Sequence, residues 1–459
     1  MLHTTPLFML AGLLPFISST LAATAVNWQS IKTSRGDKLP DFSFCGYHGS
    51  DKSLPSESST PLVRVSASSG DQTSDIQEAL DKVEAAGGGV VELGAGTFKV
   101  SVGLTLASGT ILRGSGIEST QLTVSKLKVD VPLFTLGNGT SQSVKPSLIS
   151  RITDTYVGIG ATTVKVENAT GFEAGQTVFV SRAATAEWVR ANGMPIWYGT
   201  GRNKLGFSKY MDSYVAVYTA PATSNEMGIE NLSVTLNPTC SGYVFDVTDP
   251  CNAAGIWMTP WTVDSFVRNV NMTGFNNAID VQHNASRITI DTVAFFRDRD
   301  TDRPGGYPTD INISGSQVLV RDSGQYGLAT AKAFAVITQA RVPGPNAVLR
   351  HTIQSSLQEL YPHQRWAHGL LVEDTDASVL FIDRQTAGSG QGWTMNAGVA
   401  WNTRGPINVQ SPPLGVNWAI GSSGTVDATA NGTMLKTGKS VTPRSLFAAQ
   451  LHERRNTAT

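Results

Sequence analysis

The sequence has little charge and no excess of either sign. Charged residues make up 15% of its 459 residues, and 35 Lys and Arg balance 36 Asp and Glu. This balance argues against a protein that binds nucleic acid through its overall charge. A disordered chain would have more charge and fewer large apolar residues. The low charge and the 45 glycines favour an all-β extracellular protein over a cytosolic helical enzyme.

Several common motifs are missing. We find no phosphate loop, dinucleotide fingerprint, zinc protease motif or nucleophile elbow. There are only three cysteines, and their spacing makes no zinc site. Cys240 and Cys251 flank a short loop and predict a disulfide in an oxidising compartment, which leaves Cys45 unpaired. The alternative is that Cys45 pairs with one of the other two.

Long hydrophobic runs are missing except near the N-terminus, where residues 7–21 read LFMLAGLLPFISSTL. Pro15 interrupts this run, which is too short to span a bilayer comfortably. It predicts a secretory signal peptide over residues 1–22, with a short membrane anchor as the alternative. Residues 23–59 would then be an N-terminal extension. We expect a secreted, extracellular monomer with no membrane or nucleic-acid partner.

Seven Asn-x-Ser/Thr sequons indicate a glycoprotein if the chain is secreted. The alternative for any of them is a structural asparagine in a turn. The seven are Asn138, Asn168, Asn231, Asn271, Asn284, Asn312 and Asn431.

One amphipathic helix is predicted, over residues 74–86. Ile76, Leu80 and Val83 share one of its faces. Ser74 and Gln77 form a capping-box pattern at its start, and the three glycines at 87–89 end it. Short strand-turn-strand units follow directly.

A four-residue pattern recurs from residue 229 onward: apolar, polar, small amide or carboxylate, apolar. Steps of 23 to 38 residues between copies are typical of a solenoid with inserted loops. Short strands between Asn, Asp and Gly turns predict that its coils are β, with a β-sandwich as the alternative. The third positions of the pattern are Asn231, Asn269, Thr292, Asp322, His351 and Asp374.

Three stretches, DIQEALDKVEAAGGGVVELGAGTF, GLTLASGTILRGSG and GIENLSV, resemble the pectin-lyase-like superfamily of secreted proteins. The resemblance covers residues 60 to about 400 and implies an all-β fold, a right-handed parallel β-helix with an N-terminal capping helix. We place the β-helix domain at 60–442, with a small β insertion at 160–222. Residues 443–459 are predicted to form a C-terminal helix that caps the last coil. The family's catalytic motifs are not matched residue by residue, so the resemblance gives the architecture and not the activity.

Residues 325–369 form a basic, histidine-rich zone with one acid, Glu359, and are a candidate anion site. In an extended strand, alternate side chains share a face, so His363 and Arg365 would point together and Trp366 away. The cationic residues and histidines of the zone are Lys332, Arg341, Arg350, His351, His363, Arg365 and His368.

This zone suits β-elimination on a uronic acid. The C5 proton becomes acidic only when the neighbouring carboxylate is neutralised, a role we assign to Arg365 and Arg341. His363 is the favoured base, because histidine titrates near neutral pH. His368 or Tyr361 would donate a proton to the leaving oxygen, and Lys332 is an alternative base. The structural alternatives are that His351 only continues the repeat and that a buried Arg pairs with Glu359.

The stretch FFRDRDTDRPGGYPTD, residues 295–310, alternates acids and arginines. Asp298, Asp300 and Asp302 are candidates for binding calcium, the one possible cofactor, or for the carboxylate pair of a glycoside hydrolase. We favour a third interpretation, a solvated loop in which Arg and Asp pair with each other.

Tryptophans and a tyrosine are candidates for stacking on sugar rings. The alternative is a satellite hydrophobic cluster under a long loop. The candidates are Trp188, Trp197, Tyr198, Trp366 and Trp393.

The sequence thus predicts a carbohydrate-active enzyme, most simply a polysaccharide lyase acting on a uronic-acid-containing glycan. The alternatives are a glycoside hydrolase on the same scaffold and a non-catalytic carbohydrate-binding protein.

Overall fold

The computed structural model describes residues 23–125, 127, 131–140, 146–182, 186–194, 213–218, 221–236, 254–300, 308–354, 359–360 and 362–457. The predicted signal peptide lies outside these residues. No helix among the residues described has the length and hydropathy needed to cross a bilayer.

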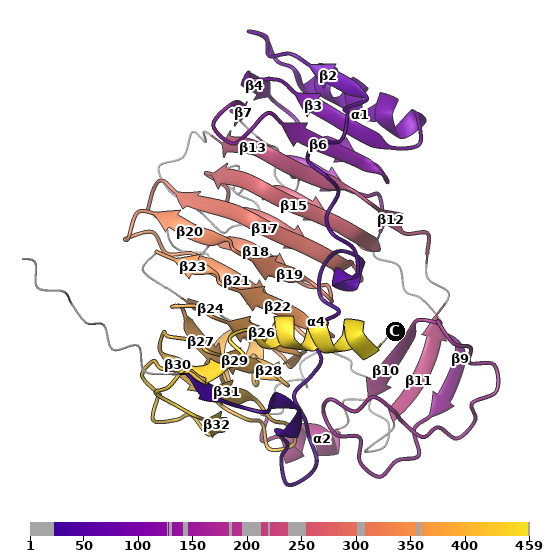
Figure 1. Ribbon diagram of the computed structural model, residues 1–459, viewed down its shortest axis with the longest axis vertical. Helices are drawn as coiled ribbons and strands as arrows, with labels where there is room; N and C mark the ends of the chain where they lie inside the picture. The colour runs from indigo at the N-terminus through magenta and orange to yellow at the C-terminus, as the bar shows by residue number, and fades with distance from the viewer. Residues whose placement is uncertain are drawn as a thin grey trace, which may run out of the picture.

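Successive coils of the chain stack into a rod, and their strands form two parallel sheets along its sides (Figure 1). This confirms the predicted parallel β-helix. The larger sheet contains β2 (Val63–Val65), β3 (Gly89–Leu93), β4 (Gly96–Val100), β6 (Thr110–Gly114), β7 (Thr120–Val124), β12 (Ser224–Asn225), β13 (Gly228–Leu236), β15 (Thr262–Thr273), β17 (Ser286–Arg297), β19 (Leu319–Arg321), β20 (Gly324–Gly327), β22 (Asn346–Leu349), β23 (Thr352–Ile353), β26 (Leu370–Glu373), β29 (Val399–Trp401), β31 (Trp418–Ile420) and β32 (Thr433–Leu435).

The smaller sheet closes the coils on another side. It contains β5 (Leu104–Leu106), β8 (Phe134–Leu136), β14 (Ala254–Met258), β16 (Asn277–Val281), β18 (Thr309–Ile313), β21 (Phe334–Thr338), β24 (Glu359–Leu360), β27 (Ser378–Phe381) and β30 (Ile407–Val409). Alternate side chains of both sheets point inward, where leucine, isoleucine, valine and phenylalanine form one continuous core. Two further strands, β25 (Ala367–His368) and β28 (Met395–Asn396), pair with each other.

The predicted repeat marks a column of left-handed residues, one in each of seven consecutive coils. Strand register aligns them, and their φ angles lie between 51° and 58°. Asparagine and aspartate adopt this conformation more readily than other side chains, which explains their recurrence. The column is Asn231, Asn269, Thr292, Asp322, Arg350, Asp374 and Asn402.

His351 was therefore placed one residue too far along. Arg350 occupies the left-handed position, and His351 follows it with a side chain only 1% exposed. The next coil shows the same alternation, because Asp374 is left-handed and Thr375 is buried.

Helix α1 (Thr73–Ala85) lies against the first coils and buries the predicted face of Ile76, Leu80 and Val83 in the core. The capping-box prediction is wrong, because the helix begins one residue earlier. Gln72 is its N-cap residue and makes no side-chain capping bond, while the amide of Thr73 donates to Asp71 Oδ1 at 3.0 Å.

Residues 23–62 form an N-terminal strap that runs along the outer side of the larger sheet, from the last coils to the first (Figure 1). At one end, β1 (Thr24–Ala25) pairs with β33 (Val441–Thr442). At the other, the amide of Leu62 donates to the carbonyl of Val90. The 3-10 turns Trp28–Ser30 and Tyr47–Ser50 belong to this strap. It covers apolar residues that would otherwise face solvent.

Helix α4 (Leu446–Thr457) packs beside the strap on this outer side. Phe447 is buried there with Phe42 and Trp418, and the Gln450 side chain accepts from the amide of Phe42 at 3.0 Å. The prediction that this helix caps the last coil is wrong. Its apolar residues pack against the outer side of the larger sheet instead.

The insertion begins earlier than predicted. Its antiparallel sheet contains β9 (Pro146–Arg151), β10 (Val178–Arg182) and β11 (Ser213–Tyr218), because β11 pairs with both other strands. Helix α2 (Ala186–Ala191) follows β10, and α3 (Ala387–Gly390) is a single turn in the main rod.

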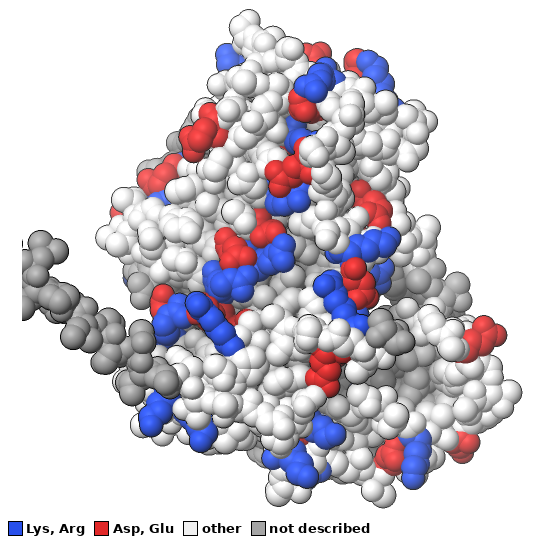
Figure 2. Space-filling view, in the orientation of Figure 1, with Lys and Arg blue, Asp and Glu red and all other residues white. Residues whose placement is uncertain are grey.

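Charged side chains form a second column, at the register position one residue before the left-handed column. Glu92, Arg113, Glu230 and Arg268 occupy the same register position in successive coils. The Glu230 carboxylate is fully buried and bridges both arginines, at 2.6 Å from Arg113 Nε and 3.1 Å from Arg268 Nε. Figure 2 shows acidic and basic groups lying next to each other over this side of the rod, rather than one area of a single sign.

Candidate functional site

A line of hydrogen-bonded polar side chains crosses the outer surface of the smaller sheet. Asp280 and Asn312 occupy the same outward position on β16 and β18, and Asn312 Nδ2 donates to Asp280 Oδ1 at 3.0 Å. Gln339, directly after β21, donates to Asn312 Oδ1 at 2.8 Å. In parallel coils, equivalent residues lie about 4.8 Å apart, so side chains with both a donor and an acceptor form a chain.

The line continues into the predicted histidine. The His363 amide donates to the Thr338 carbonyl, which places its ring above Gln339, with Nδ1 at 3.4 Å from Gln339 Oε1. Gln391 Nε2 lies 3.1 Å from His363 Nε2. We call this set the polar ladder: Asp280, Asn312, Gln339, His363 and Gln391.

Asp280 lies at one end of the polar ladder. Burial raises the pKa of its half-buried carboxyl to about 6, against the opposing effect of hydrogen bonds from Asn312 and Gln282. Trp257 is the register partner of Asp280 in the preceding coil and is partly exposed beside it. A partly protonated acid next to an aromatic ring is an arrangement that can both stack on a sugar and donate a proton.

His363 is neutral at physiological pH. Burial, followed by the charges of Arg384 and Arg365, lowers its pKa to about 4. Both ring nitrogens contact amide side chains: Nε2 lies 3.1 Å from Gln391 Nε2, and Nδ1 lies 3.4 Å from Gln364 Nε2 and from Gln339 Oε1. The ring is unprotonated and can accept a proton, but with a pKa of about 4 it is a weaker base than the near-neutral histidine that the sequence predicts.

Two arginines, Arg365 and Arg384, act on His363, and the exposed Arg341 is joined to Arg365 through the backbone. The Arg341 amide donates to the Arg365 carbonyl at 2.9 Å, so these two left-handed residues leave adjacent coils at neighbouring points. Arg384 Nη1 donates to the His363 carbonyl at 2.9 Å. We call Arg341, Arg365 and Arg384 the cationic cluster. Its first two members were predicted from the sequence, whereas Arg384 lies one coil further along and shares no local motif with them.

Other predicted catalytic residues lie elsewhere. The Ala367–His368 strand is separated from His363 by left-handed residues at 365 and 366, and His368 Nδ1 lies 3.1 Å from Asn396 Nδ2. Crowding by surrounding protein, then the charge of Arg182, lowers the pKa of His368 to about 4, although its side chain keeps an exposed edge. Tyr361 lies outside the described residues.

Lys332 is also remote from His363. It precedes β21, whereas His363 is bonded beyond the end of that strand, at Thr338. At about 3.3 Å per residue the two ends are roughly 20 Å apart, so Lys332 cannot replace His363 as the base.

The tryptophans predicted to stack on sugar rings form the hydrophobic contact between the insertion and the main rod. Trp188 of α2 packs edge-on against Trp366, with ring centroids 4.6 Å apart. Trp393 Nε1 donates to the carbonyl of Asn192 at 2.8 Å. Trp188 and Trp393 are buried in one small cluster with Val189 and Met194, which is the alternative given above for Trp188. Trp197 and Tyr198 lie outside the described residues.

The described part of the acidic loop contains one pair of the predicted kind, Asp298 with Arg299, whereas Arg297 is buried and pairs with Asp310 of β18. Asp298 forms an ion pair with Arg299 at 2.6 Å, and Asp300 accepts from Thr330 at 2.5 Å. Asp302 lies outside the described residues, as do Cys240 and Cys251. The described residues contain no group of three or more His, Cys, Asp or Glu able to hold a metal, and they give no support to the calcium hypothesis. Cys45 is free and buried.

The sequons fall into two groups by exposure. Asn138, Asn168, Asn284 and Asn431 are exposed, whereas Asn231, Asn271 and Asn312 lie within strands and are partly covered. The Asn312 amide belongs to the polar ladder, so a glycan there would disrupt it. Glycosylation itself stays a prediction.

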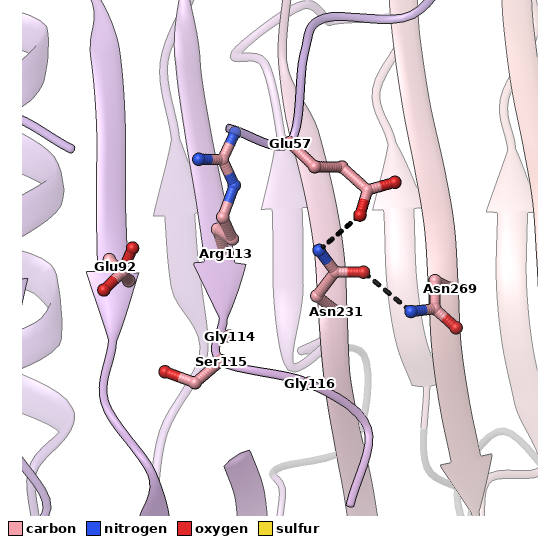
Figure 3. A pocket seen from close by; sticks show the side chains of 8 residues that line it. All are labelled: Glu57, Glu92, Arg113, Gly114, Ser115, Gly116, Asn231 and Asn269. Atoms are coloured by element: carbon pink, nitrogen blue, oxygen red, sulfur yellow. Dashed lines mark hydrogen bonds between the residues drawn. The ribbon is translucent and has the colours of Figure 1, made fainter. Parts of the chain in front are cut away.

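A depression of about 500 Å³ lies over the first coils (Figure 3). Its floor includes Asn231 and Asn269, joined by a 2.7 Å hydrogen bond, and Glu57 of the strap accepts from Asn231 at 3.1 Å. The acids here also bind arginines, since Glu57 lies 3.3 Å from Arg268 and Glu92 pairs with Arg64. We place the candidate site at the polar ladder instead, because the ladder contains His363 with Arg365 and Arg384 beside it.

His351 makes the fold sensitive to acid. Neither ring nitrogen has a hydrogen-bond partner in the described part of the chain, and burial lowers the pKa of His351 to about 4. As pH falls from about 6.5 to 4, the unfolded chain takes up a proton that the folded chain does not, so stability falls by up to about 3 kcal/mol. We expect His351→Leu to reduce this loss, measured as the change in denaturant midpoint between pH 7 and pH 4.5.

His283 provides the control for that measurement, because its side chain is exposed. His283→Gln should keep the full acid sensitivity of the original protein. An identical acid dependence in His351→Leu and the original protein would show that His351 is not the responsible group.

Comparisons with known proteins identify no family for this chain. No family model and no curated protein matches the sequence. Among solved structures, the tailspike protein of E. coli bacteriophage HK620 in complex with pentasaccharide is 11% identical, with a TM-score of 0.44. That comparison covers 91% of this chain and 64% of the tailspike. A mutant of the same tailspike gives 10% identity, a TM-score of 0.45 and the same coverage. The fold assignment rests on the strand pairing described above.

Proposed function

We propose that this protein binds an acidic polysaccharide along the polar ladder and cleaves it by β-elimination at His363. The observation that carries the proposal is a neutral histidine, inside a line of sugar-compatible hydrogen-bonding groups, with cations as its charged neighbours. Secretion, which would bring such an enzyme to its substrate, is part of the same proposal.

The reaction follows from these groups. The cationic cluster neutralises the uronate carboxylate, which makes the C5 proton acidic. His363 Nε2 accepts that proton, once substrate displaces the Gln391 amide. The electron pair of the C5–H bond forms a C4–C5 double bond, and the C4–O bond breaks. The leaving oxygen takes a proton from solvent, and the His363 imidazolium returns its proton to solvent, so the products are a new chain end and an unsaturated uronate, with no net consumption of water.

Asp280 supports a second candidate, a glycoside hydrolase. A carboxyl with pKa about 6 is a reasonable general acid. Hydrolysis also needs a second carboxylate within about 5–10 Å. Within the described residues, Asp280 is the one carboxylate of the polar ladder, so we rank this candidate second.

A substrate screen decides among these functions. Purified protein is incubated with a panel of acidic and neutral polysaccharides, and the products are followed by ultraviolet absorbance and by a reducing-end assay. A lyase produces both signals on a uronate polymer, and a hydrolase produces reducing ends alone. Retention on a glycan column with neither signal would identify a binding protein and refute cleavage.

Arg365→Ala is expected to reduce kcat/KM on a confirmed uronate substrate about 100-fold, because one carboxylate-neutralising group is lost. Arg64→Ala is the matched control, since Arg64 is 67% exposed and pairs with Glu92 at the other end of the rod. Both variants should keep the thermal midpoint of the original protein within a few degrees. Equal kcat/KM in all three proteins would remove Arg365 from the site.

A further inference from the structure

A second pocket lies beside the left-handed column, where Arg350 and Asp374 contribute to its lining. It shares no residue with the polar ladder. It has a volume of about 280 Å³ and is lined by Arg350, Thr352, Asp374, Asp376, Arg404 and Arg444, with His351. Three arginines line it: Arg350 and Arg404 follow strands of the larger sheet, and Arg444 lies between β33 and α4. The pocket has no part in the proposed elimination.

All three guanidinium nitrogens of Arg404 donate to protein acceptors. Its Nε donates to Asp376 Oδ1 at 2.5 Å, its Nη1 to Asp374 Oδ1 and its Nη2 to the Asp374 carbonyl. It therefore fixes the two aspartates rather than offering donors to a ligand.

Among the residues that the structure describes, Arg350 and Arg444 each donate hydrogen bonds through Nε and Nη2 but not through Nη1. Arg350 binds Asp322 through Nε and Nη2, at 2.6 and 2.7 Å. Arg444 binds Asp374 through the same two nitrogens, at 3.4 and 3.1 Å. Within the described residues, Nη1 of each makes no hydrogen bond. The Arg350 and Arg444 side chains are 40% and 84% exposed, so these donors are accessible.

The chemistry of the remaining donors defines the ligand. Thr352 adds an exposed hydroxyl to the two unused guanidinium edges. Asp322 lies just outside the lining and balances the charge, so attraction by net charge is weak here. Selection rests on N–H and O–H groups, which suit an acceptor with several oxygen atoms.

We propose that this pocket is an oxyanion site, in which Arg350 and Arg444 hold a sulfate or carboxylate group through their Nη1 edges and Thr352 donates its hydroxyl. The oxyanion comes either from solution or from an acidic glycan. This site is independent of the polar ladder and stands whether or not His363 is catalytic.

The test measures sulfate binding to the full chain by calorimetry, with chloride at matched ionic strength as the reference. Arg350→Asn is a suitable variant, because asparagine already occupies the same left-handed position at 231, 269 and 402. We expect Arg350→Asn and Arg444→Ala each to raise the dissociation constant for sulfate at least tenfold. Arg64→Ala and His363→Gln should leave it unchanged.

A second arm identifies the source of the oxyanion. A uronate oligosaccharide is titrated into sulfate-saturated protein, in the His363→Gln background to prevent cleavage. Displacement of sulfate assigns the site to a glycan carboxylate, and no displacement assigns it to a free oxyanion. Sulfate binding no stronger than that of chloride, or equal binding in the original protein and both arginine variants, would overturn the proposal.

Discussion

Glu230→Gln is expected to lower the free energy of unfolding by about 3–5 kcal/mol. The Glu230 carboxylate is 0% exposed and is shared by Arg113 and Arg268. Removing its charge leaves the guanidinium of Arg113, itself only 4% exposed, without its buried counter-ion. The carbonyls of Ser56 and Ser59 still accept from Arg113, but they carry no charge.

Glu92→Gln is the matched control for this change. Glu92 occupies the same register position in an earlier coil, but its partner Arg64 is 67% exposed, so the loss should be below about 1 kcal/mol. Both are measured by denaturant unfolding at one pH. A loss at Glu230 no larger than that at Glu92 would show that the buried triad contributes little.

His363→Gln is expected to reduce kcat on a uronate substrate by about 10²–10⁴-fold, the usual contribution of a general base. Glutamine can still hydrogen-bond Gln339 and Gln391, so the polar ladder and the fold should persist. The assay is the rate of ultraviolet absorbance at saturating substrate, with His283→Gln as the control. A variant that retains at least half of the original kcat would exclude His363 as the base.

The pH dependence distinguishes the two catalytic candidates. If His363 is the base, kcat/KM rises as pH increases through about 4, because the free base form is required. If Asp280 is a general acid, activity falls as pH increases through about 6, because its proton is lost. A falling limb that disappears in Asp280→Asn would favour hydrolysis over elimination.

Much of the architecture could be predicted from local patterns. The recurring Asn and Asp mark the left-handed turns, and the glycines after α1 mark its end. The one-residue error at His351 has a physical cause. Leu349 occupies the outward position that Glu230 and Arg268 hold in earlier coils, and it is buried by the strap and α4. The repeat pattern expects a polar residue at the outward position. Where another element covers the sheet, that residue is apolar, and the pattern is then matched one residue too late.

The candidate site was only partly accessible to sequence reasoning. His363 and Arg365 are two residues apart and so lie close together, but the predicted strand alternation is wrong, because residues 363–366 form a bend in which Arg365 and Trp366 are left-handed. Asp280, Asn312 and Gln391 join them through coil stacking, and their sequence separations depend on loops of unequal length. The strap was missed for a similar reason, since its partners lie hundreds of residues away.

The strap also constrains the order in which the chain can fold. Residues 24 and 25 leave the ribosome early, yet their pairing partners at 441 and 442 are synthesised more than 400 residues later. The coils must therefore stack before the strap can be fixed at both ends, and the apolar flank beneath it stays uncovered during that interval. Completion of the last strand then seals the flank, so premature termination of translation would leave a rod prone to self-association.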